Sequence, residues 1–211
     1  MADRPLVHAI LPATVFLAPV AMRPDRFTHP SPWLGALIAF IVLASQPPVD
    51  LREASSHGAA DRGSALAILI AMIVAQLAAS IEFARSVHTP GIAVVGIGAV
   101  IATGGLTLRV WAIRTLGRFF TSTVRVVDGQ RVVRSGPYCL LRHPSYTGAL
   151  LAALGAIIAL GSVIGGALLL GLCVPAYLYR ITVEERALIE ELGRDYADYR
   201  RGSWGLVPGL R

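Results

Sequence analysis

Long apolar runs, separated by short polar segments, cover most of this chain. They span residues 6–22, 33–44, 64–81, 91–113 and 147–181. A membrane-spanning helix needs about 20 apolar residues; the third and fourth runs meet this length, whereas the second must tilt or include its flanks. The fifth run is too long for one helix and is interrupted at Gly161-Ser162 and Gly165-Gly166. It therefore predicts a helical hairpin with arms near 145–160 and 164–182.

The first run is either a cleaved signal peptide or a retained membrane helix. Its apolar stretch and its small residues near 18–21 are typical of a signal peptide. However, Pro12 and Pro19 interrupt the run, and Asp3 reduces the positive charge of the segment before it. We therefore expect a retained helix. The whole chain is then an all-α integral membrane protein of five to six transmembrane helices, including the C-terminal hairpin.

Composition and charge support a membrane protein and indicate its orientation. Charged residues make up 15% of the 211 residues, compared with about 25% in soluble domains. All 19 basic residues are arginine, and six of them lie within 114–145 beside one acid, Asp128. Such a bias marks the cytoplasmic side. We therefore interpret the net charge of +6 as a determinant of membrane orientation rather than as a sign of nucleic-acid binding. Both termini and a small cap, formed by 114–145 and 183–211, are expected to face the cytoplasm.

The chain divides into an N-terminal membrane region, 1–113, and a chemically richer region, 114–211. The first region has few polar groups within its runs, such as Gln76 and Arg109. Ionisable groups near mid-membrane mark transport pathways, so their scarcity argues against a transporter. Cys139 and Cys173 are too far apart for a metal or redox pair, and we expect no metal site.

The first polar cluster is Arg142-His143-Pro144-Ser145-Tyr146, immediately before the hairpin. Pro144 suits the first position of a helix, which makes His143 the capping residue. A helix N-terminus attracts anions, and the guanidinium of Arg142 can bind a carboxylate through two parallel hydrogen bonds. The cluster therefore predicts a carboxylate site at the membrane boundary. The alternative is a plain helix cap with an interfacial Arg and Tyr.

The second polar cluster follows the hairpin and includes Arg180, Glu184 and Glu185. Arg180 and Glu184 are four residues apart and share a helix face. The hairpin should return this cluster to the side of Arg142, which predicts an active site at the membrane surface. A solvated amphipathic helix is the alternative, although it explains the Glu pair less well because these residues lie within a turn of the last apolar ones.

Four motifs together resemble the signature of isoprenylcysteine carboxyl methyltransferases, which prokaryotic membrane methyltransferases and phospholipid methyltransferases partly share. They are Gly136-Pro137-Tyr138, Arg142-His143-Pro144-Ser145-Tyr146-Thr147-Gly148, Arg180-(x3)-Glu184-Glu185-(x2)-Leu188 and Gly193-(x2)-Tyr196-(x2)-Tyr199. The resemblance extends over about 106–208. Membrane sterol reductases have a related motif, but typically with Asn and an acid where this chain has Ser145 and Ala149.

The resemblance implies an S-adenosylmethionine-dependent methyltransferase. Its cofactor pocket would open to the cytoplasm, and its lipophilic substrate would arrive from the bilayer. The matching residues imply cofactor contacts by His143, Tyr146, Gly148 and Glu185. Arg142 and Arg180 would position a substrate carboxylate, and Glu184 would hold one of these arginines. The face of the Tyr146 ring could also bind the sulfonium by a cation–π contact.

Carboxyl O-methylation of an isoprenylcysteine-like acceptor is the activity that we expect. A carboxylate is ionised at neutral pH and needs no general base, whereas a lipid amine would require one and His143 is the only candidate in the clusters. Methylation of a phospholipid or of a small thiol is the alternative. A membrane scaffold or transporter without chemistry is the alternative of another class. The sequence leaves the methyl acceptor and the oligomeric state open.

Overall fold

The computed structural model describes residues 14, 16–45, 63–121 and 128–209. In chain order the elements are η1 (Pro24–Thr28), α2 (Pro30–Ala44), α4 (Ser64–Arg85), α5 (Ile92–Leu116), η2 (Gly117–Phe119), η3 (Gly136–Cys139), α6 (Pro144–Ala159), α7 (Val163–Leu168), η4 (Leu169–Cys173), α8 (Val174–Leu192) and α9 (Arg194–Gly202). The all-α prediction is confirmed. Within the first apolar run, residues 16–21 are helical, whereas 6–13 and 15 lie outside the described residues.

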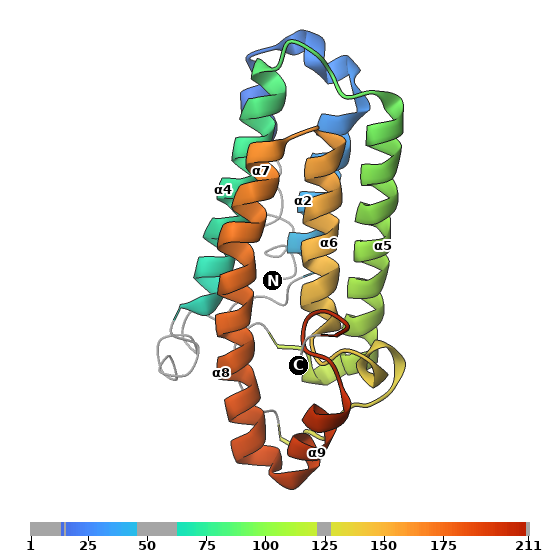
Figure 1. Cartoon of the computed structure of the whole chain (residues 1–211), viewed down its shortest axis with the longest axis vertical. Coiled ribbons are helices and arrows are strands. Elements are labelled where there is room, and N and C mark those ends of the chain that lie inside the picture. Colours follow the sequence, from blue (N-terminus) through green and yellow to red (C-terminus); the bar gives the residue numbers. More distant parts are fainter. Residues whose placement is uncertain (1–13, 15, 46–62, 122–127, 210–211) are drawn as a thin grey trace, which may run out of the picture.

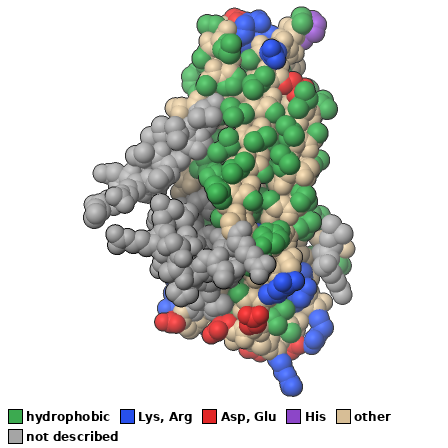
Figure 2. Space-filling view, turned by 90° about the vertical axis from the view of Figure 1, so that its left-hand side faces the viewer, with side chains coloured by type: hydrophobic (Ala, Val, Ile, Leu, Met, Phe, Trp, Pro, Cys, Tyr) green, Lys and Arg blue, Asp and Glu red, His purple; other side chains and the backbone are tan. Residues whose placement is uncertain are grey.

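The long helices lie side by side along the long axis of the molecule (Figure 1). Within the described residues, three helical stretches are long and apolar enough to cross a membrane: Ser64–Arg85, Ile92–Phe119 and Val163–Leu192. Two shorter apolar helices, α2 and α6, lie among them. Figure 2 shows apolar side chains over the middle of the molecule and charged side chains at its two ends. This distribution fits an integral membrane protein, and the predicted number of five to six spans stays a prediction.

The predicted helical hairpin is present, with one arm longer than expected. Its first arm is α6, and α7, the short π-helical segment η4 and α8 together form the second. We expected the second arm to end near 182, but it continues to Leu192. The Glu, Ala, Arg and Leu residues beyond the apolar run are good helix formers. The helix ends where Gly193 adopts a φ of +57°, which favours glycine.

Backbone-to-backbone packing joins α5 to α6. A Cβ atom added at Gly148 would lie 2.6 Å from the carbonyl oxygen of Gly105 and 2.7 Å from the nitrogen of Arg109. Gly98 and Gly155 meet in the same way further along. Small residues allow such close approach between membrane helices. The contact fixes where α6 begins relative to α5, and therefore where the Arg142-His143 segment lies.

Arg109 ties three helices together below this segment. Its side chain is buried, its Nε donates a hydrogen bond to Ser45 Oγ at 2.8 Å, and its Nη1 donates to the carbonyl oxygen of Ser145 at 3.1 Å. These bonds link α5 to the end of α2 and to the first turn of α6. Arg109 therefore helps to position the start of α6.

An acidic residue outside the predicted runs fixes the turn of the hairpin at the opposite end. Glu82, near the end of α4, accepts a hydrogen bond from Ser162 Oγ at 2.5 Å and one from the backbone nitrogen of Ile164 at 3.0 Å. A carboxylate at a helix N-terminus satisfies free N–H groups and complements the helix dipole. Glu82 thus caps α7.

The C-terminal tail folds back onto the segment before α6. The backbone of Trp204 accepts a hydrogen bond from Arg142 at 2.8 Å and donates one to Leu140 at 2.9 Å. Helix α9 lies between this contact and the end of α8 (Figure 1). We call this end of the molecule, formed by the described residues of 114–145 and 183–209, the cap. Both polar clusters therefore meet at one end of the molecule, as the sequence predicted.

Candidate active site

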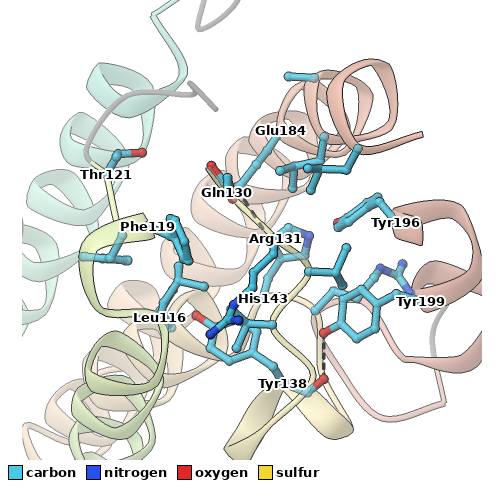
Figure 3. Close-up of a pocket in the computed structure, with 18 of the residues that line it drawn as sticks. Leu116, Phe119, Thr121, Gln130, Arg131, Tyr138, His143, Glu184, Tyr196 and Tyr199 are labelled. Carbon is cyan, nitrogen blue, oxygen red and sulfur yellow. Dashed lines mark hydrogen bonds and ion pairs between the residues drawn. The ribbon is translucent and has the colours of Figure 1, made fainter. Parts of the chain in front are cut away.

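A pocket of about 840 Å³, counting the space at its open mouth, lies in the cap. Its walls come from the end of α5, residues 130–133, the segment leading into α6, the second half of α8, and α9 (Figure 3). The predicted site residues that line it are Arg142, His143, Tyr146, Arg180 and Glu184. Polar side chains from both clusters therefore line one pocket.

His143 and Pro144 begin α6 as the sequence predicted. Pro144 is the first residue of the helix and His143 is its N-cap. However, one N–H group of this helix N-terminus, that of Tyr146, donates to the carbonyl oxygen of His143 at 3.1 Å. The imidazole of His143 turns instead toward α8. The predicted anion site at this helix N-terminus is therefore partly closed by the backbone itself.

Arg142 and Glu185 form the centre of a buried ionic cluster. Arg142 Nε donates to Glu185 Oε1 at 2.6 Å, and their side chains are 3% and 6% exposed. The same carboxylate contacts His143 Nε2 at 3.1 Å and Arg200 Nε at 2.9 Å. Arg142 Nη1 also donates to the carbonyl oxygen of Ser203 at 2.5 Å. Protein groups therefore already bind part of the Arg142 guanidinium, and Glu185 is not among the residues that line the pocket. The substrate role of Arg142 and the cofactor contact of Glu185 stay predictions.

A second chain of hydrogen bonds lines the pocket itself. Arg180 Nε donates to the Tyr146 hydroxyl at 2.9 Å, and that hydroxyl donates to Glu184 Oε2 at 2.7 Å. Arg180 Nη1 also donates to Ser64 Oγ on α4 at 3.2 Å. Glu184, which we expected to hold an arginine, is linked to Arg180 through the Tyr146 hydroxyl. The tyrosine hydroxyl therefore sets the separation between a cation and an anion in the pocket.

Neighbouring groups already contact the ring of Tyr146. The His143 ring stacks on it with 5.5 Å between centroids and 4° between planes, and the Tyr177 ring lies 5.0 Å away. The guanidinium carbon of Arg180 lies 6.0 Å from the ring centroid. The sulfonium contact that we considered for this ring would have to compete with these neighbours.

Gly148 has a packing role. It faces α5 in the close contact described above, on the side of α6 that is buried against that helix. Any side chain here would meet the backbone of α5. The cofactor contact that the resemblance implies for Gly148 stays a prediction.

Three pocket residues were quoted as motif positions but were given no role from the sequence: Tyr138, Tyr196 and Tyr199. Burial raises the pKa of each phenol, for Tyr199 to about 12. All three therefore keep their protons at neutral pH and are able to donate a hydrogen bond. The Tyr199 hydroxyl donates to the carbonyl oxygen of Tyr138 at 2.7 Å, which attaches α9 to the segment before α6. The spacing of three between Tyr196 and Tyr199 places them on one helix face, and this signal was available in the sequence.

Comparison with known proteins places this arrangement in a family. The model of the isoprenylcysteine carboxyl methyltransferase (ICMT) family matches residues 96–190. A probable protein-S-isoprenylcysteine O-methyltransferase of Oryza sativa subsp. indica is 31% identical over 105 residues, covering 49% of this chain and 55% of that protein. Protein-S-isoprenylcysteine O-methyltransferase B of Arabidopsis thaliana is 30% identical over 142 residues, covering 64% and 72%. The chain belongs to the isoprenylcysteine carboxyl methyltransferase family.

The fold agrees with membership of this family. A solved structure of the eukaryotic intramembrane Ras methyltransferase ICMT aligns with a TM-score of 0.53 and 19% identity, covering 86% of this chain and 68% of that one. The chain spans about half the length, 55%, of the rice relative. The family match covers most of α5, all of α6 and most of α8, and it includes all the residues that line the pocket except Leu192, Tyr196 and Tyr199.

Proposed function

We propose that this protein is an S-adenosylmethionine-dependent membrane methyltransferase that acts on a lipophilic acceptor. The specific reaction that we propose is carboxyl O-methylation of an isoprenylcysteine-like molecule. The observation that carries the proposal is the Arg180–Tyr146–Glu184 chain, which places a cation and an anion next to each other in a pocket of a membrane protein. The names of the family relatives support the same activity.

The residues of the pocket fit the cofactor. When bound, S-adenosylmethionine would supply a methyl group on a positively charged sulfur. Glu184 offers a carboxylate to that charge, because it lines the pocket and its side chain is 30% exposed. Apolar side chains such as Leu188 and Leu192 line the same pocket and offer a surface for an aromatic base. His143, held between the two glutamates, would complete the wall beside Glu184.

Arg180 is the residue that we assign to the acceptor carboxylate. A guanidinium matches the two oxygens of a carboxylate and holds them in a fixed orientation. Tyr146 and Ser64 hold Arg180 in place, so the acceptor would meet a fixed cation. A carboxylate is already ionised at neutral pH, and no residue has to remove a proton from it. Catalysis would then rest on holding the two reactants in line, which is worth roughly 7–11 kcal/mol in favourable cases.

Arg142 and Glu185 are positioning residues in this mechanism. Their ion pair joins the segment before α6 to α8, and Glu185 also fixes the imidazole of His143. Both ring nitrogens of His143 face glutamate oxygens, at 3.7 Å and 3.1 Å. An imidazole bound in this way is a poor general base for a lipid amine, which favours the carboxylate acceptor over the phospholipid alternative.

The test is methyl transfer by purified protein in detergent or lipid discs. We expect labelled S-adenosylmethionine to methylate a farnesylcysteine analogue, with the label released by mild base as expected for a methyl ester. Label in phospholipid or in a small thiol instead would support the alternative acceptors. S-adenosylhomocysteine should also raise the melting temperature. At 100 times its dissociation constant, a ligand that binds only the folded state adds about 2.7 kcal/mol to the free energy of unfolding. Absence of both transfer and binding would refute the methyltransferase proposal and leave a scaffold or transporter.

A further inference from the structure

Tyr196 is a buried pocket residue whose hydroxyl has no hydrogen-bond partner. It lies on α9, its side chain lines the pocket, and the residue is 4% exposed. In the described part of the protein, its hydroxyl is one of three buried side-chain polar atoms without a partner. Figure 3 shows Tyr196 reaching from α9 toward the middle of the pocket. Buried polar groups in native proteins are normally paired, and each exception needs an explanation.

Tyr199 provides the contrast within the same helix. It also lines the pocket, but its hydroxyl donates to the carbonyl oxygens of Tyr138 at 2.7 Å and Leu141 at 3.3 Å. The two rings pack edge to face with centroids 5.8 Å apart. One tyrosine of the pair thus attaches α9 to the protein, whereas the other presents a donor that nothing in the described structure accepts. Burial raises the pKa of Tyr196, so that donor keeps its proton at neutral pH.

We propose that Tyr196 is a ligand-binding residue whose hydroxyl donates to an acceptor atom of the nucleoside part of the cofactor. The proposal rests on the proposed function for the identity of the cofactor. It assigns to the Gly193-(x2)-Tyr196-(x2)-Tyr199 motif two separate tasks, ligand binding at its first tyrosine and attachment of α9 at its second.

The surroundings of Tyr196 favour the nucleoside over the amino-acid end of the cofactor. The carboxylates of Glu185 and Glu184 act on Tyr196 and help to raise its pKa, so a further carboxylate next to its hydroxyl would be repelled. Leu188 and Leu192 of α8 line the same pocket, and apolar walls suit a flat aromatic base. The nitrogen and oxygen atoms of adenine and ribose are neutral acceptors, which a neutral phenol can bind without a charged partner.

Two matched substitutions test the proposal: Tyr196→Phe and Tyr199→Phe, each made in the full chain. Removing a hydroxyl that lacks a partner should leave the melting temperature of the ligand-free protein unchanged or higher, whereas Tyr199→Phe should lower it. In calorimetry, Tyr196→Phe should bind S-adenosylhomocysteine roughly 2- to 13-fold more weakly, as expected for the loss of one neutral hydrogen bond. Tyr199→Phe is the control for stability, because the hydrogen bond that it loses attaches α9 to the segment before α6.

A second ligand locates the contact on the cofactor. 5′-Methylthioadenosine keeps the nucleoside and lacks the amino acid, so Tyr196→Phe should weaken its binding by the same factor. A loss confined to S-adenosylhomocysteine would place the contact at the amino-acid end and overturn the nucleoside assignment. Wild-type affinity in Tyr196→Phe, or a destabilised or unfolded Tyr196→Phe protein, would overturn the binding role itself. If the wild-type protein binds neither ligand, the proposed function fails as well.

Discussion

Arg142 and Glu185, which are 43 residues apart in the chain, form a buried ion pair of 2.6 Å that joins the start of α6 to α8. Removing one member of such a pair leaves a buried charge without its partner, at a cost of roughly 3–5 kcal/mol. We therefore expect Glu185→Gln to lower the stability of the protein and to weaken S-adenosylhomocysteine binding by displacing His143 and Arg142. Thermal melts and calorimetry on the same preparation measure both effects.

The control for Glu185→Gln is Glu190→Gln on the same helix. Glu190 is exposed, and exposed substitutions usually change stability by less than about 0.5 kcal/mol. Asp198→Asn is a second control, because Asp198 pairs only with the exposed Arg201 on α9 among the described residues. Equal and small effects at all three positions would show that the Glu185 cluster does not organise the site.

Arg180 and Glu184 should affect different steps. If Arg180 holds the acceptor and Glu184 faces the cofactor, Arg180→Ala should raise the KM for a farnesylcysteine analogue and leave cofactor affinity nearly unchanged. Glu184→Gln should do the opposite. A hydrogen bond to a charged group is worth about 1.5–3 kcal/mol, so each affinity should fall roughly 10- to 150-fold. Steady-state kinetics and calorimetry separate the two quantities. Both variants changing the same quantity would contradict the division of roles, and the double variant would then measure their coupling.

The glycine contact between α5 and α6 predicts opposite effects at two adjacent residues. Gly105→Ala should destabilise the protein by roughly 1–3 kcal/mol, because its Cβ atom would lie 2.7 Å from the carbonyl oxygen of Gly148. Gly104→Ala should be neutral or stabilising by up to about 1 kcal/mol, since nothing lies within 4 Å of a Cβ atom there. Thermal unfolding in detergent compares the two. If both variants were equally stable, α5 and α6 could move apart at little cost, and their close contact would not limit stability.

Orientation in the membrane can be tested with a native residue. Cys139 is exposed in the cap, whereas Cys173 is buried. We expect the cap to face the cytoplasm because of its arginine excess. A membrane-impermeant maleimide should therefore label Cys139 only after cells are permeabilised. Cysteine introduced at the exposed Thr89, at the opposite end, should react in intact cells. Labelling of Cys139 from outside would reverse the orientation.

The sequence predicted those parts of the structure that depend on local pattern. The apolar runs predicted the long helices, Pro144 predicted the start of α6, and the interruption near Gly161 predicted the hairpin turn. The end of α8 was missed because helix propensity continues beyond the apolar residues. These features follow from neighbouring residues alone, and for that reason they can be inferred without knowledge of the fold.

The sequence did not show which polar groups bind each other. Arg142 binds Glu185 and backbone carbonyl groups of the tail, which approach it only in the folded protein. The motif that contains Gly148 does not show that this glycine packs against α5. Glu82 was overlooked because its partner, the N-terminus of α7, is 80 residues away from it in the chain.

The docking of the tail on the segment before α6 has a consequence for the order in which the protein is made. The carbonyl groups of Arg200 and Ser203 that bind Arg142, and the Trp204 backbone that pairs with Leu140, are synthesised after every membrane helix described above. The pocket can therefore acquire its last wall only after all the described helices of the bundle have been made. A chain that stopped before residue 200 would contain these helices and would leave Arg142 without its partners in the tail.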